Sequence, residues 1–132
     1  MGRKFLISFV VMLVMTVAFG IIVHGFLLGG DYAAMQQLYR HPGDMSYMPY
    51  LYLGQALFAA AFVWIYQKGR EDKPFLMQGI RYGAAVAVLA TIPTFLTYYA
   101  VQPLPAVMVL KQIVFSTIGV VISGIVLAWL NK

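Results

Sequence analysis

Long apolar segments alternate with short polar ones along the whole chain. Predominantly apolar runs cover residues 5–28, 47–67, 75–100 and 105–130, and most charged residues lie between these runs or at the chain ends. A helix of about 20 apolar residues is long enough to cross the roughly 30 Å hydrocarbon core of a bilayer. The pattern therefore predicts an all-α, polytopic membrane protein, in which four transmembrane helices form one bundle and one domain, 1–132.

Aromatic and proline residues indicate the ends and the shape of these predicted helices. The second run closes with Trp64 and Tyr66, and such side chains are enriched where helices leave the hydrocarbon core. Pro74 suits the first turn of the third helix. Pro93 lies inside that helix and lacks the backbone donor that the α-helical ladder needs, so we expect a kink just before it.

The composition agrees with a membrane protein and argues against a soluble one. Hydrophobic residues make up 62% of the chain and charged residues 10%, whereas soluble domains are about 45–50% apolar and about 25% charged. The net charge of +5 does not indicate a nucleic-acid partner, because the basic residues lie at the ends of apolar runs and not along one polar face. The chain has no Cys, which excludes disulfides, thiolate metal sites and thiol redox chemistry.

The basic residues also predict an orientation. Cytoplasmic segments of membrane proteins carry an excess of Lys and Arg. The N-terminus, the second connection and the C-terminus hold Arg3, Lys4, Lys68, Arg70, Lys73 and Lys132, whereas the other side holds Arg40 and Lys111. We therefore expect both termini in the cytoplasm (N-in, C-in) of a bacterial inner membrane. The first apolar run far exceeds the ~7–15 residues of a signal-peptide core, so it is interpreted as a retained helix.

Polar residues near the outer ends of the predicted helices form the candidate ligand site. His24, Gln55, Tyr98 and Gln112 each come from a different helix and lie at comparable depth in this topology. Convergent polar groups in an apolar setting are typical of a pocket for a quinone, a lipid head group or a small polar ligand. The alternative is a hydrogen-bonded network that fixes how the helices pack. No metal site, catalytic residue or bound cofactor is expected, although contact with a lipid or a quinone is compatible with the pattern.

The first outer connection, residues 29–44, is the longest one. Gly29 and Gly30 end the first helix, and residues 32–39 can form a short amphipathic helix. Asp31 is placed to cap its N-terminus, and Arg40 and His41 lie at its C-terminal end, where the helix dipole favours cations. Such a helix would be either a lid over a pocket or a plain surface helix.

Small residues recur at helical spacing in the first, third and fourth predicted helices. Gly25 and Gly29 form a GxxxG pair, as do Gly79 and Gly83. The last helix carries a face of small residues, namely Ser116, Gly119, Ser123 and Gly124. Faces of this kind let membrane helices approach closely, so they predict packing rather than chemistry.

Four local motifs resemble those of small four-span bacterial inner-membrane proteins of unknown function. They are HGFLLGGDY at the end of the first helix, KGRE in the basic connection, QGIRYG at the start of the third helix, and prolines and tyrosines at its far end. The resemblance implies the architecture and the location but no activity. Small multidrug transporters share the helix count, but their pattern requires a carboxylate within the first helix, and here the first acid is Asp31, beyond that helix.

Two functions remain open at this stage. No P-loop, zinc motif or nucleophile elbow occurs in the sequence. The leading expectation is a non-catalytic accessory or assembly subunit of a larger bacterial membrane complex, with electron-transfer complexes among the candidates. The alternative is a small homo-oligomeric transporter or channel with a polar site near the outer face. The expected partners are the lipid bilayer and either other membrane proteins or further copies of the chain.

Overall fold

The structure is a computed structural model that describes residues 2–41 and 43–132. Of the chain, 83% is helical, and the described residues contain no strand, so the predicted all-α class is confirmed. Four helices are long and apolar enough to cross a membrane, as the sequence predicts. They cover Arg3–Leu27, Met48–Gly69, Phe75–Val101 and Ala106–Leu130.

Two of these four spans contain a stretch of π-helix. The first consists of α1 (Arg3–Gly20) followed by the π-helix η1 (Ile21–Leu27). The third consists of α4 (Phe75–Val86), the π-helix η3 (Ala87–Thr91) and α5 (Ile92–Val101). The irregular stretch η3 ends just before Pro93, which is where the sequence predicts a kink, because Pro93 cannot donate to the helical ladder. The other two spans, α3 (Met48–Gly69) and α6 (Ala106–Leu130), are uninterrupted α-helices.

The predicted helix over residues 32–39 is wrong in its bounds. The structure has two short helices there, α2 (Gly29–Ala34) and the 3₁₀-helix η2 (Gln36–Leu38). Leu28 precedes α2 at the cap position, and Asp31 lies within its first turn. The chain therefore turns into α2 at the glycines that were expected only to end the first span.

Helices α4 and α6 approach each other closely along their small residues. A methyl group added to Gly79 would lie 2.6 Å from the Cα atom of Ile125, and one added to Gly83 would lie 2.6 Å from the Cα atom of Val121. No real side chain tolerates such distances, so only glycine fits at these two positions. The Gly79–Gly83 pair thus places the two backbones in contact. The Gly25–Gly29 pair makes no such contact, because a methyl group added to Gly25 would meet only Ile21 of its own span, at 3.9 Å, and one added to Gly29 would meet no atom within 4 Å.

A second packing centre joins α1, α3 and α6 near the chain termini. Met12, Val63 and Leu127 are fully buried against one another. Tyr82 of α4 closes this centre, because its hydroxyl donates a hydrogen bond to the carbonyl of Phe62 on α3 and its ring packs against the Phe62 ring. All four spans therefore meet in this half of the molecule.

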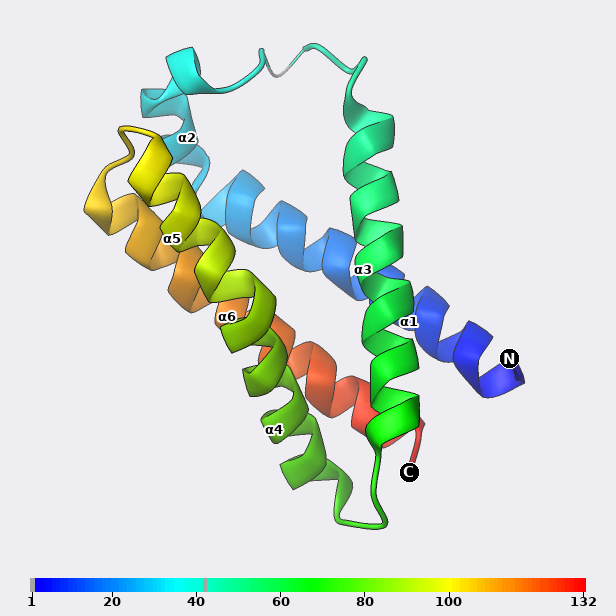
Figure 1. Cartoon of the computed structure of the whole chain (residues 1–132). Coiled ribbons are helices and arrows are strands. Elements are labelled where there is room, and N and C mark those ends of the chain that lie inside the picture. Colours follow the sequence, from blue (N-terminus) through cyan, green and yellow to red (C-terminus); the bar gives the residue numbers. More distant parts are fainter. Residues whose placement is uncertain (1, 42) are drawn as a thin grey trace.

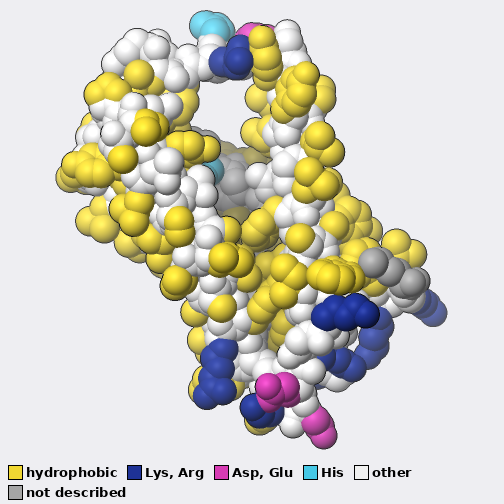
Figure 2. Space-filling view, viewed as in Figure 1, with side chains coloured by type: hydrophobic (Ala, Val, Ile, Leu, Met, Phe, Trp, Pro, Cys, Tyr) yellow, Lys and Arg dark blue, Asp and Glu magenta, His cyan; other side chains and the backbone are white. Residues whose placement is uncertain are grey.

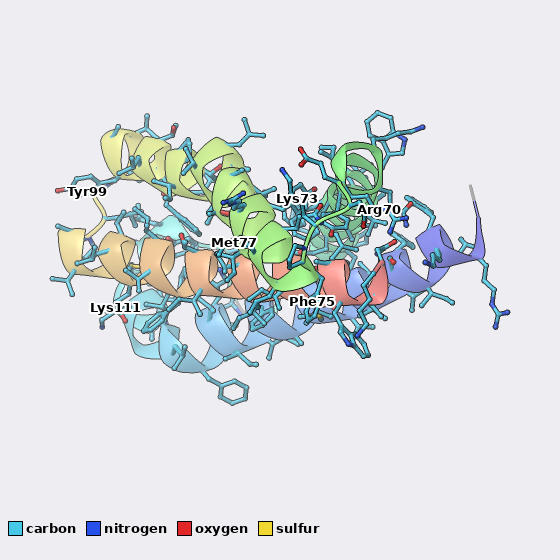
Figure 3. The ribbon with its side chains drawn as sticks, turned by 90° about the horizontal axis from the view of Figure 1, so that it is seen from below. Arg70, Lys73, Phe75, Met77, Tyr99 and Lys111 are labelled. Atoms are coloured by element: carbon cyan, nitrogen blue, oxygen red, sulfur yellow. The ribbon has the colours of Figure 1, made fainter. Side chains whose placement is uncertain are left out.

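Polar contacts complete this end, which we call the termini end. The buried side chain of Asn131, just after α6, donates to the Ser8 hydroxyl of α1 and accepts from the Gln67 amide of α3. Arg70 donates to the Asn131 carbonyl. Most Lys and Arg side chains in view gather here (Figure 2), and Figure 3 shows Arg70 and Lys73 at the end opposite Lys111.

At the opposite end, called the loop end, α3 diverges from the other three spans (Figure 1). The loop end consists of α2, η2, the segment that leads to α3, and the connection between α5 and α6 (Figure 1). A small apolar cluster around Leu104, Met108 and Val109 packs there beneath Tyr32 and Tyr39. The neighbouring half of α3 takes no part in it, because the residues from Pro49 to Gly54 are all exposed. A hollow consequently opens between α3 and α5 (Figure 2).

Candidate functional site

A cavity of about 340 Å³ lies among the spans at the level where α3 separates from α5. All four spans contribute to its wall. The wall consists of Thr16, Phe19, Gly20, Val23, His24, Gly54, Gln55, Phe58, Ala90, Thr91, Thr94, Phe95, Ser116, Gly119, Val120 and Ser123. Its volume falls in the lower part of the ~300–1,000 Å³ range of small-molecule sites, and its lining is mostly apolar with a few polar groups, as in such sites.

Both π-helical stretches border this cavity. His24 belongs to η1, and Ala90 and Thr91 belong to η3. Single turns of π-helix are frequent at functional sites, because the wider turn shifts side chains away from the positions that a regular helix gives them. Both irregular stretches thus shape the wall of one cavity.

The polar side chains of the wall fall into two groups. The hydroxyls of Thr16, Thr94 and Ser123 donate to carbonyls of their own helices, at 2.6–3.0 Å. These three hydroxyls have their donor satisfied within the protein. By contrast, the Gln55 amide and the hydroxyls of Thr91 and Ser116 have no hydrogen-bond partner among the residues that the structure describes. The free polar groups are the ones that can bind a molecule in the cavity.

His24 is held by a three-residue network. Its Nδ1 atom lies 2.7 Å from the hydroxyl oxygen of Tyr32 on α2. The Gln112 amide of α6 donates a hydrogen bond to the same oxygen, at 2.8 Å. Gln112 is 2% exposed. Tyr32 therefore links the first span to the last at the loop end.

An ion pair lies next to this network. The ammonium group of Lys111 lies 3.2 Å from the carboxylate of Asp31, and these two residues directly precede Gln112 and Tyr32. Two successive residues of α2 thus contact two successive residues of α6. Burial raises the pKa of the Tyr32 hydroxyl above its ordinary value, with the nearby Asp31 charge acting in the same direction.

The structure places three of the four predicted ligand residues at one site. His24 and Gln112 meet through Tyr32, and Gln55 lines the cavity into which His24 faces. Tyr98 does not join them. Its side chain is 46% exposed and does not line the cavity, and its ring packs edge-on against Phe95.

The three residues predicted for a lid have other roles. Asp31 pairs with Lys111 instead of capping a helix. The Arg40 guanidinium lies over the ring of Tyr47, 3.3 Å from its centroid, and so holds the segment that leads into α3. Nδ1 of His41 accepts a hydrogen bond from the backbone of Gly43 within a local turn. Arg40 and His41 are both exposed and do not line the cavity.

Tyr32 is the site residue that sequence reasoning missed as a contact. It lies eight positions after His24, a spacing at which two residues of a continuous helix share a face. The sequence does not indicate this contact, because Gly29 and Gly30 lie between His24 and Tyr32 and predict that the helix ends there. Within residues 2–41 and 43–132, no group of three or more His, Asp or Glu is arranged to hold a metal ion.

Comparison of the chain with protein-family models, curated proteins and solved structures finds no match.

Proposed function

We propose that this chain is a non-catalytic, four-span protein of the bacterial inner membrane, which binds a lipid-soluble molecule with a polar head in the cavity beside His24. A lipid or a quinone has this chemistry. The protein would serve as an accessory subunit of a larger membrane complex. The observation that carries the proposal is the open side of the cavity between α3 and α5 (Figure 2).

The position of this opening decides which molecules can reach the cavity. An opening between two spans, well inside their length, faces lipid tails when the spans cross a bilayer. The wall beside it is largely apolar, with Phe19, Phe58 and Phe95 among its residues. A molecule dissolved in the membrane reaches such a site sideways, whereas a strongly hydrated solute would first have to lose its water.

The proposed orientation has both termini and the α3–α4 connection in the cytoplasm. The excess of Lys and Arg at the termini end supports it. The Asn131 network supports only the placement of these segments on one side, because it joins the start of α1 and the ends of α3 and α6. In this orientation the cavity lies in the outer half of the membrane. Lys68→Cys should react with a thiol reagent only from the cytoplasm and Arg40→Cys only from outside, and the reverse pattern would refute the orientation.

The exposed surface of α3 supports the accessory role. Its loop-end half is exposed around its circumference, with Tyr50 at 72% and Leu53 at 56% exposure. A partner helix packed there would cover the open side of the cavity and bring a bound quinone next to an electron-transfer protein. Purification in a mild detergent should therefore recover the chain together with larger membrane proteins. Recovery of the chain alone would contradict the accessory role.

Ligand binding is tested by filling the cavity. Gly54 lines it, and a methyl group added there meets no atom within 4 Å, so Gly54→Trp adds an indole at the cavity wall whose Cβ atom meets no backbone. Gly69→Trp, at the end of the same helix and equally open, is the matched control. Wild-type protein and the control should carry lipid or quinone into purification, as measured by mass spectrometry of extracts. Equal recovery with Gly54→Trp would refute the proposed site.

The exposed half of α3 also favours a second candidate function, a homo-oligomeric transporter or channel. A second copy packed on α3 would cover the opening and join two cavities into one pathway. This alternative predicts flux of a polar solute in proteoliposomes that contain the purified chain alone. The flux should disappear with Gly54→Trp and persist with Gly69→Trp.

A further inference from the structure

With the Gln112 amide nitrogen facing Tyr32, as the structure has it, one arrangement of hydrogen atoms satisfies both contacts of the Tyr32 hydroxyl. The Gln112 amide donates to the Tyr32 oxygen, so the Tyr32 hydroxyl keeps its own hydrogen for another acceptor. Among the described residues, the acceptor within reach is Nδ1 of His24, at 2.7 Å. Nδ1 therefore accepts and carries no hydrogen. A neutral imidazole has one hydrogen on its two ring nitrogens, so His24 carries it on Nε2.

The surroundings of His24 favour this neutral form. The wall of the cavity contains no Asp or Glu side chain that would pair with an imidazolium. An unpaired charge among apolar side chains within a membrane span is costly. The carboxylate nearest along the chain, Asp31, is already paired with Lys111. The ring is thus held as a neutral group with a defined donor.

Nε2–H is the donor left for a molecule in the cavity. His24 lines the cavity, and its Nδ1 atom is occupied by Tyr32. Within residues 2–41 and 43–132, Nε2 has no hydrogen-bond partner. Gln55 of α3 lines the same cavity and brings an amide N–H₂ that is also free. The cavity therefore presents two neutral N–H donors, from two different spans, in an otherwise mostly apolar wall.

We infer that the cavity recognises a carbonyl oxygen at the head of a lipid-soluble molecule, with His24 Nε2–H and the Gln55 amide as the hydrogen-bond donors. This inference rests on the proposed function and adds the chemical class of the ligand. A carbonyl oxygen has two lone pairs and no hydrogen, so it accepts from both donors without leaving a hydrogen unpaired. Two sources offer it, namely the ring carbonyl of a quinone and the ester carbonyl of a diacyl lipid.

Tyr32 and Gln112 act as positioning residues in this site. Neither lines the cavity, so neither is expected to touch the ligand. Their role is to fix which ring nitrogen of His24 carries the hydrogen and where the ring points. The same logic applies to metal-bound histidines, where the partner of one ring nitrogen fixes the state of the other.

Binding is measured with matched probes in nanodiscs of ether-linked lipid, which contain no ester carbonyl. The first pair is an alkyl benzoquinone and the matched dialkoxybenzene, whose ether oxygens are weaker acceptors. The second pair is an ester-linked phospholipid and its ether-linked counterpart. Wild-type protein should bind the carbonyl member of one pair more tightly than the ether member of the same pair. The pair that shows this preference identifies the source of the carbonyl.

Variants assign the preference to the two donors. Loss of one neutral hydrogen bond weakens binding roughly threefold to tenfold. His24→Phe and Gln55→Leu should each weaken the binding of the carbonyl probe by this factor and leave the binding of the ether probe unchanged. His24→Gln keeps an N–H donor and should restore part of the preference. Equal binding of both members of both pairs to wild-type protein would overturn the inference, as would variants that do not affect the preference.

The tautomer is measured directly by NMR of protein with nitrogen-labelled histidine. His24 should show the hydrogen on Nε2, and Tyr32→Phe should give a mixture of both tautomers. A wild-type ring with its hydrogen on Nδ1 would overturn the inference even if ligand binds. Failure of the proposed function looks different, because Gly54→Trp would then leave the binding of every probe unchanged. If Gly54→Trp abolishes binding but carbonyl and ether probes bind alike, only the carbonyl inference fails.

Discussion

The side-chain amide of Asn131 donates a hydrogen bond to the hydroxyl of Ser8 at 3.0 Å, across 123 positions of the chain. Both side chains are buried, with 3% and 1% exposure. The same amide donates to the Leu127 carbonyl, and its oxygen accepts from Gln67. One short side chain thus satisfies polar groups of the first, second and fourth spans, and it does so at the very end of the chain.

Asn131→Leu is expected to destabilise the protein more than Ser8→Ala. The leucine leaves the buried Ser8 hydroxyl and the partly buried Gln67 amide without their partner, and an unsatisfied buried group such as Ser8 costs about 1–3 kcal/mol. Ser8→Ala removes one acceptor, while the Asn131 amide keeps its bond to Leu127. Equilibrium unfolding in mixed micelles measures both variants. Equal losses of stability in the two variants would show that the hydrogen bond to Ser8 alone accounts for the stabilisation by Asn131.

Gly83→Ala tests the contact between α4 and α6. The added methyl group would lie 2.6 Å from the Cα atom of Val121, so the helices must separate, and overpacking of this kind costs about 1–3 kcal/mol. Gly54→Ala is the control, because the space around Gly54 is open. Thermal unfolding in detergent should show a lower midpoint for Gly83→Ala and little change for the control. A Gly83→Ala protein as stable as the wild type would contradict the close approach.

Tyr32 should make stability depend on pH in the alkaline range. Burial raises the pKa of its hydroxyl above the ordinary value of 10.0, so the folded state holds the hydrogen at pH values where the unfolded chain has lost it. The unfolded state then binds fewer protons, and stability falls as pH rises above 10.0. The stabilisation is fully present below that pH.

Tyr32→Phe isolates this contribution. At neutral pH the variant should be less stable, by about 1–3 kcal/mol, because Gln112 loses its acceptor and His24 its donor. Above pH 10.0 the difference from wild type should shrink, since wild-type protein loses its own stabilisation there. The free energy of unfolding at several pH values gives the answer. A difference that stays constant with pH would show that Tyr32 does not titrate differently in the two states.

Loss of the ion pair and loss of the neighbouring Gln112 amide should lower the free energy of unfolding by different amounts. Lys111 and Asp31 have side-chain exposures of 42% and 26%, so Lys111→Met should cost less than about 1 kcal/mol, and the cost should fall further in high salt. Gln112→Leu removes a buried donor from the Tyr32 oxygen and should cost about 1–3 kcal/mol, independent of salt. Unfolding at low and high ionic strength compares the two variants. A strong salt dependence in Gln112→Leu would contradict this assignment.

The four spans and the close contact of α4 with α6 were predictable from the sequence, for a local reason in each case. An apolar run of sufficient length has few alternatives to a membrane span, and Gly79 and Gly83 have no side chain that could keep two helices apart. The irregular stretch before Pro93 follows from the missing backbone donor.

The site was only partly predictable, because depth along a helix does not fix which way a side chain faces. Tyr98 was expected at the depth of the other three residues, but it does not line the cavity, and 46% of its surface is exposed. Tyr32 was missed as the partner of His24, since the glycines before it predict a break and the structure continues into α2. The hydrogen bonds of Asn131 could not be predicted, because its partners come from two other spans. Such contacts depend on tertiary packing.

The π-helix η3 also accommodates an extra residue with little effect on the rotational phase between the two halves of its span. A π-helical turn holds more residues than an α-helical one, so deletion of one residue within Ala87–Thr91 would let the span close into regular α-helix. Because the wider turn already absorbs the extra residue, everything after the deletion would keep nearly the same rotational phase relative to α4. Thr94 and Phe95 would stay in the wall of the cavity, and Gly79 and Gly83 would keep their contact with α6. The same deletion within an uninterrupted helix such as α6 would turn everything after it by about 100° and change the side chains that face the ligand.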